Sequence, residues 1–308
     1  MPITPTSKIW MNGELVAWDD AKVHFLNPTL HYGWGVFEGI RAYATPRGPA
    51  VFRLTDHIAR LFRSAKIYLM TPDFTEEQIV EAAKQTVAVN EVEACYVRPL
   101  IYLGYGEMGL NPLPSHAEVS IAVWPWGAYL GEEAIENGCR AVISSWKRND
   151  MNMIPPAAKA SGQYLNSSLA KVAALKAGYD EAILTSANGH IADGSGENVF
   201  LVKNNRLITP PLTDGPLAGI TRASVMQIAL DEGYDVAEEH VVRTDLYLAD
   251  EAFFTGTAAE LVPIVEVDDR RIGDGKPGAV TRHLRELFQA ATRGELDRYK
   301  DWAEYVRD

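Results

Sequence analysis

One lysine has surroundings that could make it reactive. Lys159 is the only charged residue in the segment 154–161, and its neighbours there are small or apolar. A lysine shielded from water has a lowered pKa and can attack a carbonyl carbon to form a Schiff base. Tyr164, five residues later, could hydrogen-bond a bound molecule, although a packing tyrosine is an equal alternative. An exposed loop lysine is the ordinary reading of Lys159 taken alone.

Two glycine-containing turns could bind an anion. Residues 217–222 contain Gly219, Ile220 and Thr221 and open a predicted helix, whose first N–H groups have no partner within the helix. Residues 255–260 follow an apolar strand, and there Gly256 and Thr257 let the backbone approach a ligand closely. Each turn alone is also typical of an ordinary helix start or strand end. Neither matches a nucleotide-binding glycine loop.

Charged residues elsewhere could complete such a site. Asp193 and Glu197 lie in a glycine-rich turn, where acidic residues are usually solvated, but a pyridine nitrogen needs an acidic partner to keep its proton. Arg98 lies within a predicted strand and must face solvent, a partner or a ligand carboxylate. Arg60 lies on a predicted helix, where an exposed ion pair is the default. A lysine, two anion turns, an acidic turn and a tyrosine together meet the needs of a pyridoxal 5'-phosphate site.

Composition excludes several other classes of protein. The 308 residues carry 29 Lys+Arg against 41 Asp+Glu, a net charge of −12, which argues against binding nucleic acid or anionic membranes. Cys95 and Cys139 are far apart and form no Cys-x-x-Cys pair, so we expect free thiols and no metal site. The N-terminal residues do not resemble a signal peptide, and no apolar run could span a bilayer. A cytoplasmic protein is expected.

The elements that must position these residues are strands and helices, which in the first part of the chain occur in blocks. In the first part, Asn12-Gly13 predicts a hairpin, and Thr75 with Gln78 predicts a capping box that opens a helix. In the second part, Leu165, Leu169, Val172 and Leu175 predict a helix that stops at Gly178. The remaining predicted strands are 40–44, 50–53, 94–103, 118–124, 140–144, 182–185, 199–202, 207–209 and 252–255, and the remaining predicted helices are 55–69, 219–231 and 281–292. The pattern indicates a mixed α/β (α+β) protein.

At these residues the sequence resembles the class IV (fold-type IV) pyridoxal-phosphate aminotransferases, most closely the branched-chain amino-acid aminotransferases. The likeness runs from Ile9 to about Trp302. The matching stretches are 31–41, 96–100, 125–131, 157–160, 194–198, 217–222, 247–251 and 255–260. The resemblance implies two domains, a smaller one over 1–124 and a larger one over 136–308, joined by a loop over 125–135, with the cofactor in the cleft between them.

The resemblance also implies roles for the cofactor-binding residues. Lys159 would be the Schiff-base lysine and proton carrier, and Tyr164 would bond the cofactor phenolate. Asp193 stands where the family has a glutamate that holds the pyridine nitrogen, and Glu197 is a less favoured substitute. The implied phosphate-binding set is Arg60, Gly219, Ile220, Thr221, Gly256 and Thr257.

For substrates, the resemblance implies a pocket for both an aliphatic chain and a carboxylate. Arg98 would receive the distal carboxylate of glutamate, and Leu110 would reach the site of a neighbouring subunit in a homodimer or hexamer. Trp34 is bulkier than the usual residue near the pocket wall. The implied α-carboxylate site comprises Tyr96, Thr257 and Ala258, and the implied apolar wall comprises Tyr32, Phe37, Trp126, Tyr129 and Tyr164.

The implied reaction is transamination between L-leucine, L-isoleucine or L-valine and 2-oxoglutarate. One alternative is a D-amino-acid or (R)-amine transaminase, or aminodeoxychorismate lyase, on the same scaffold. A cofactor-binding protein without turnover is another. Tyr96 with Arg98, and the loop 125–131, favour the branched-chain reading, while Lys159, Tyr164 and Arg60 argue against the loss of turnover.

Overall fold

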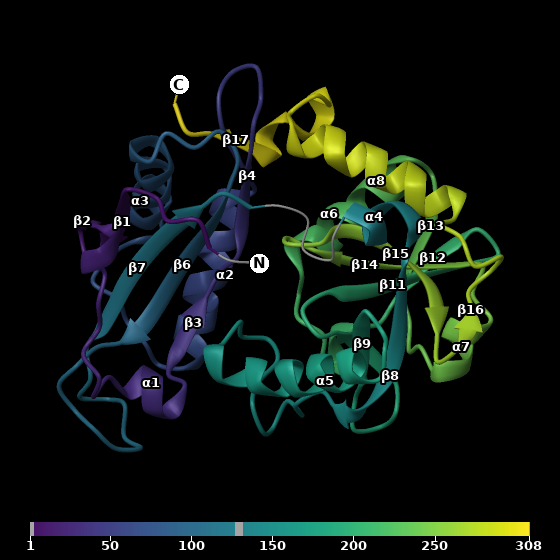
Figure 1. Ribbon diagram of the computed structural model, residues 1–308, viewed down its shortest axis with the longest axis horizontal. Helices are drawn as coiled ribbons and strands as arrows, with labels where there is room; N and C mark the ends of the chain where they lie inside the picture. The colour runs from purple at the N-terminus through teal and green to yellow at the C-terminus, as the bar shows by residue number, and fades with distance from the viewer. Residues whose placement is uncertain (1–2, 127–131, 308) are drawn as a thin grey trace. The chain divides into compact units, whose positions relative to one another are not determined.

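A computed structural model describes residues 3–126 and 132–307. The chain divides into two compact units, each with its own β-sheet. Among the described residues, unit 1 comprises 3–126, 158–162 and 290–307, and unit 2 comprises 132–157 and 163–289. The two sheets and their helices are drawn in Figure 1. None of the described helices is both long and apolar enough to cross a membrane.

Unit 1 is built on an antiparallel sheet in the order β17-β5-β4-β6-β7-β1-β2, with β3 also paired to β6. Helices α2 and α3 pack together, and α3 covers β1, β6 and β7. The strands are β1 (Lys8–Met11), β2 (Glu14–Ala17), β3 (Gly35–Phe37), β4 (Ile40–Tyr43), β5 (Ala50–Phe52), β6 (Cys95–Leu103), β7 (Ala117–Trp124) and β17 (Ala303–Tyr305), and the helices are α1 (Pro28–Tyr32), α2 (Leu54–Ile67) and α3 (Glu76–Val89).

Alternation along β6 sorts its side chains onto two faces. Val97 and Ile101 are fully buried in the core beneath α2 and α3, whereas Tyr96 and Arg98 point to the opposite face. The predicted hairpin between β1 and β2 and the capping box of Thr75 with Gln78 are both confirmed. Trp34, the bulky residue expected near the pocket wall, packs edge-on against Tyr68 in this unit, with ring centroids 5.6 Å apart, and so has a packing role.

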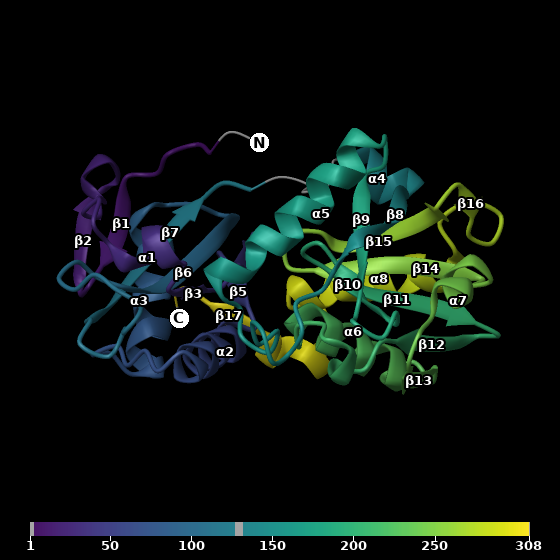
Figure 2. The same cartoon turned by 90° about the horizontal axis from the view of Figure 1, so that it is seen from below.

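Unit 2 is built on a mixed sheet in the order β10-β9-β8-β15-β14-β11-β12-β13, with β16 added to β15. Helix α5 packs on β8 and β9, as Figure 2 shows, and α6 packs on β13 and β14. The strands are β8 (Cys139–Lys147), β9 (Glu181–Thr185), β10 (Ile191–Gly194), β11 (Asn198–Lys203), β12 (Arg206–Thr209), β13 (Asp235–Glu238), β14 (Glu251–Gly256), β15 (Glu260–Val267) and β16 (Arg270–Arg271). The helices are α4 (Glu132–Asn137), α5 (Tyr164–Lys176), α6 (Ile220–Asp231), α7 (Arg243–Tyr247) and α8 (Ala279–Thr292), the last of which continues into unit 1.

In helix α5 the apolar stripe that predicts the helix is not the face that is buried. The helix forms as predicted, but its apolar stripe of Leu165, Leu169, Val172 and Leu175 is exposed, with Leu165 at 73%. The face packed in the unit consists of Ser167, Ala170 and Ala174, because small side chains let the helix lie close to β8 and β9. The stripe is therefore an exposed apolar surface.

Candidate active site

The candidate lysine belongs to unit 1, although it lies in a short segment, residues 158–162, separate in sequence from the main part of that unit. Residues 158–162 return to the sheet edge, where Ala160 forms an antiparallel bridge with Val36 of β3. The Phe37 amide donates to the Lys159 carbonyl at 3.0 Å, and the Lys159 amide donates to Ser64 Oγ on α2 at 3.1 Å. The backbone of Lys159 is thus fixed on both sides.

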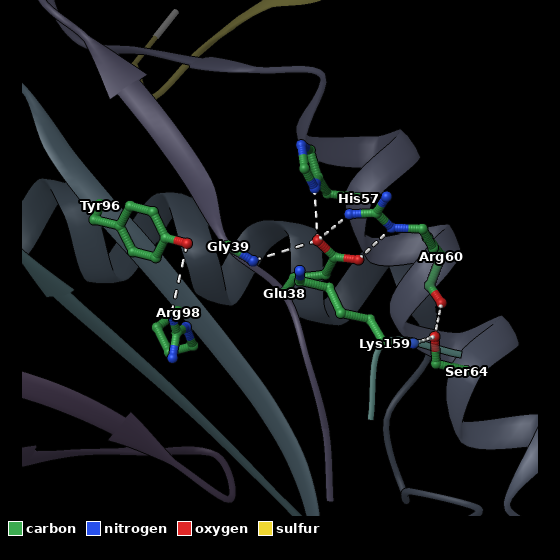
Figure 3. A network of polar contacts seen from close by, with 8 residues as sticks. All are labelled: Glu38, Gly39, His57, Arg60, Ser64, Tyr96, Arg98 and Lys159. Atoms are coloured by element: carbon green, nitrogen blue, oxygen red, sulfur yellow. Dashed lines mark hydrogen bonds and ion pairs between the residues drawn. The ribbon is translucent and has the colours of Figure 1, made fainter. Parts of the chain in front are cut away.

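A buried ionic cluster lies beside this segment (Figure 3). The Glu38 carboxylate receives Arg60 through Nε at 2.6 Å and through a terminal nitrogen at 2.8 Å, and it contacts His57 Nδ1 at 2.7 Å. Burial alone would raise the pKa of Glu38, but Arg60 and His57 lower it well below its usual range. Burial lowers the pKa of His57, opposed by Glu38. Arg60 is therefore held in one orientation by a permanently charged partner.

An aromatic cluster surrounds Arg98 on the open face of the same sheet. Its guanidinium carbon lies 4.7 Å from the centre of the Phe37 ring and 5.2 Å from that of Tyr96, and the Lys159 amine lies 5.0 Å from the centre of Phe37. Trp126 stacks near Tyr96 with ring centroids 4.6 Å apart. Arg98 Nε is buried and has no hydrogen-bond partner within residues 3–126 and 132–307. This arrangement combines an apolar wall with an unsatisfied cationic donor.

Not all predicted substrate residues join that cluster. Tyr32 ends α1 with a half-exposed side chain, and Leu110 is 81% exposed in the segment between β6 and β7. Among the described residues, neither makes a ring or polar contact with the cluster. Tyr129 lies outside the described residues, as do the other residues of 127–131 within the predicted loop 125–135.

A polar pocket in unit 2 collects the predicted acidic residues. Its lining includes Arg148, Tyr164, Asp193, Glu197, Asn198 and Leu217. Asp193 lies inside β10 and is buried, whereas the sequence suggested a turn. Arg148 donates to Asp193 Oδ1 through two nitrogens, one of them at 2.7 Å, and also to Ser167 Oγ at 3.1 Å. Burial raises the pKa of Asp193 to about 6 despite Arg148.

Carboxylates outnumber cations around this pocket. Glu197 and Glu181 are buried near Asp193. Arg148 bonds to Asp193, and Lys171 pairs with Glu181 at 2.6 Å. Burial and the Glu181 charge raise the pKa of Glu197 well above its usual range. The cluster therefore favours one additional positive charge, which suits a protonated pyridine nitrogen.

The two predicted anion turns are both present in unit 2. Helix α6 begins after Gly219 with no side-chain cap, and Asn198 donates to Leu217 O at 2.9 Å, which braces the turn. A Cβ at position 219 would lie 2.0 Å from Asn198 Oδ1, so the turn requires glycine. Ile220 and Thr221 open the helix and are nearly buried. The open helix end suits a phosphate.

The second turn, residues 257–259, joins β14 to β15 and carries Thr257 and Ala258. Gly256 ends β14 and approaches residues 196 and 197. Thr255 Oγ1 is buried and lacks a hydrogen-bond partner in the part of the chain that the structure describes. An unsatisfied hydroxyl beside this turn is the kind of group that a bound anion would satisfy.

Sequence reasoning missed three contributors. Arg148 follows β8 directly, and a charged residue at the carboxyl end of a strand in a parallel pair was a signal that could have found it. Glu38 appeared only within a matching stretch, and Ser64 gave no signal, because its contact with Lys159 joins residues 95 positions apart.

Comparison with known proteins adds to this geometry. The sequence model of the amino-transferase class IV family matches residues 35–267. The branched-chain-amino-acid aminotransferase of Escherichia coli K12 is 45% identical over 97% of both chains. The crystal structure of the T.th. branched-chain amino acid aminotransferase complexed with N-(5'-phosphopyridoxyl)-L-glutamate has a TM-score of 0.94 and 45% identity, and covers 98% of this chain and 99% of that chain.

The same T.th. protein complexed with 4-methylvaleric acid matches with a TM-score of 0.93 and 44% identity, over 98% and 99% of the two chains. The family model covers most of the chain, and the relative from Escherichia coli K12 matches nearly all of it, so both place the chain in one family. The chain belongs to the class IV aminotransferases.

Proposed function

We propose that this protein moves an amino group between L-leucine, L-isoleucine or L-valine and 2-oxoglutarate, using pyridoxal 5'-phosphate. One observation carries the dual specificity: Arg98 lies on the faces of Phe37 and Tyr96 with its Nε buried and unsatisfied among the described residues. The rings can bury an aliphatic chain, and the guanidinium can pair with the distal carboxylate of glutamate. The T.th. relative, crystallised with a glutamate derivative and with 4-methylvaleric acid, supports this reading.

When bound, pyridoxal phosphate supplies a carbonyl carbon and an electron-withdrawing ring that acidifies the Cα–H of an amino acid. In our proposal, Lys159 is the covalent attachment point and moves the proton at Cα. Its fixed backbone, held by Phe37 and Ser64, limits where the amine can reach. Proton transfer of this kind depends on such positioning.

The other residues bind and orient. Arg60, held by Glu38, and the backbone at Gly219, Ile220 and Thr221 bind the phosphate, as do Gly256 and Thr257 at the second turn. Asp193 holds the proton of the pyridine nitrogen, with Arg148 fixing the carboxylate. The proposed remaining contacts are Tyr164 to the phenolate, Tyr96 and Ala258 to the α-carboxylate, and Tyr32, Trp126 and Tyr129 to the side-chain wall.

The visible spectrum of the holoenzyme tests this function. We expect the cofactor band to bleach with both L-leucine and L-glutamate. Bleaching only with D-alanine or an (R)-amine would assign the protein to the rival transaminases. A Lys159→Ala variant, which keeps the backbone bonds to Phe37 and Ser64, should fold but lose turnover. Full activity in that variant would overturn the assignment of the lysine.

We also propose that the protein is a cytoplasmic homo-oligomer, a dimer or a hexamer. The exposed stripe of α5 and the exposed Leu110 support self-association, because monomers rarely leave such apolar surface uncovered. Two buried free thiols, Cys95 and Cys139, are consistent with a reducing compartment. Light scattering should give a multiple of the chain mass, reduced by Leu165→Glu or Leu169→Glu. A monomeric wild-type protein would contradict this proposal.

A further inference from the structure

Unit 2 holds a cluster of two histidines and one aspartate outside the candidate active site. His190 Nδ1 lies 3.1 Å from one oxygen of Asp214, and His240 Nδ1 lies 2.8 Å from the other. The two imidazole rings are 4.5 Å apart between centroids and inclined by 37°. Asp214 is buried, His190 is partly buried and His240 is exposed. Each oxygen of the Asp214 carboxylate therefore faces the Nδ1 atom of one histidine.

Backbone contacts outside the side-chain cluster hold the three residues in place. His190 ends the turn between β9 and β10, where its carbonyl accepts from the Ser186 amide at 2.7 Å. The next residue, Ile191, donates to the carbonyl of Val241, which places the segment after β13 beside β10. Asp214 ends a short 3-10 helix over Leu212–Asp214, and Gly215 caps this helix in the left-handed conformation. The donor atoms are preorganised by these segments.

We propose that His190, Asp214 and His240 bind a divalent transition-metal ion of the zinc class. Two ligand atoms on one tetrahedral Zn²⁺, at bonds of about 2.0–2.1 Å, lie about 3.3 Å apart. The nitrogen–oxygen separations of 2.8 and 3.1 Å, each to a different oxygen of Asp214, are hydrogen-bond distances somewhat shorter than this value. The ligand atoms of the three residues all lie within 4.8 Å of one another, so small side-chain movements would bring them around one ion. Imidazole with a carboxylate suits zinc, cobalt, nickel or copper, whereas calcium and magnesium prefer oxygen ligands.

The site has three protein ligands and an entry route. Side-chain exposure of 58% at His240 leaves one side open to solvent, so water can complete the coordination. No sequence motif marks the site, because the ligands are separated by 24 and 26 positions. The bound ion would link three segments: the turn before β10, the segment after β13 and the 3-10 helix Leu212–Asp214. Its role is structural, since no candidate catalytic residue belongs to the cluster.

The test uses untagged holoenzyme, stripped with a chelator and then equilibrated with micromolar Zn²⁺. We expect about one zinc per chain by elemental analysis after gel filtration, and a higher thermal midpoint with zinc than without it. His240→Gln, at an exposed position that should not disturb folding, should weaken zinc binding at least about tenfold and abolish the thermal shift. Asp214→Asn and His190→Gln should do the same.

His283→Gln is the matched control. His283 also faces a carboxylate, that of Glu232 at 3.4 Å, but among the described residues no second histidine joins that pair in a group that could hold a metal ion. Zinc binding and the thermal shift should be unchanged in this variant. Three results would each overturn the site: stoichiometric zinc in His240→Gln, an equal loss of zinc binding in His283→Gln, or binding only at millimolar zinc. The three residues would then form only a hydrogen-bonded His–Asp–His group.

Discussion

Arg148 and Asp193 form a buried ion pair in which two guanidinium nitrogens donate to the same carboxylate oxygen, Oδ1. Both side chains are less than a tenth exposed. The pair comes from the end of β8 and from β10, and so joins two strands that are not neighbours in the sheet. The ion pair fixes the Asp193 carboxylate, which we propose binds the protonated pyridine nitrogen of the cofactor.

Replacing Arg148 with methionine should destabilise the protein strongly. The change leaves Asp193 buried without its cation, and breaking a buried pair from one side costs about 3–5 kcal/mol. Urea unfolding monitored by fluorescence measures the change. The double variant with Asp193→Asn should recover part of the loss, because no uncompensated charge remains. An unfolding midpoint unchanged in the single variant would mean that the pair contributes no stability.

The raised pKa of Asp193 predicts a pH dependence of stability after cofactor removal. The folded state holds this proton more tightly than the unfolded state, whose pKa is near 3.8, so the stabilisation is complete below that value. It is lost as the pH rises through about 6, by roughly 3 kcal/mol in total. The wild-type unfolding free energy should therefore fall across this window relative to that of Asp193→Asn. A constant difference between the two would contradict the raised pKa.

Arg98→Ala should separate the two substrates. Loss of a charge-assisted bond to the distal carboxylate costs about 1.5–3 kcal/mol, which is roughly 10- to 100-fold in kcat/KM for glutamate. Activity with leucine should persist, since the rings of Phe37 and Tyr96 remain. Arg41→Ala is a suitable control, because Arg41 lies on β4 of the same sheet and stacks on Tyr43. Equal losses with both amino acids would refute this division of the pocket.

Ser64→Ala should impair the reaction without affecting substrate binding. The variant removes the Ser64 hydroxyl that accepts from the partly buried Lys159 amide, at a cost of about 1–3 kcal/mol, and loosens the lysine. We expect kcat to fall about tenfold while KM for leucine is unchanged, because Ser64 is not one of the proposed substrate contacts. Thr86→Val is the control, since it also removes a buried helical hydroxyl bonded to the carbonyl four residues earlier. If both variants lose kcat equally, Ser64 has only a structural role.

Local features were readable from sequence, because their causes are local. The capping box at Thr75, the hairpin at Asn12-Gly13 and the uncapped helix start at Gly219 each depend on residues a few positions apart. Lys159 could be singled out as a candidate because its small and apolar neighbours are also close in sequence. These features do not require knowledge of how distant segments pair.

What sequence could not supply depends on distant contacts. The apolar stripe on α5 predicts a helix correctly. Periodicity does not say whether that apolar face packs against the core of its own unit or is exposed, and Leu165 is exposed. Asp193 was expected in a turn and lies in a buried strand, because β9 and its own segment pair across the Asn188-Gly189 turn. Its bond with Arg148 spans 45 positions. The domain boundaries and the site roles stay predictions.

The assembly of unit 1 from three stretches of chain has a consequence for synthesis. Strand β17, at residues 303–305, pairs with β5 at residues 50–52. In the Lys159 segment, Ala160 forms a bridge with Val36 of β3. A ribosome must therefore make all of unit 2 before the sheet of unit 1 can be completed. Until then the edge of β5 is uncovered in the nascent chain, open to pairing with other chains. The lysine-bearing unit is therefore completed only after unit 2 has been made, although most of its residues are made first.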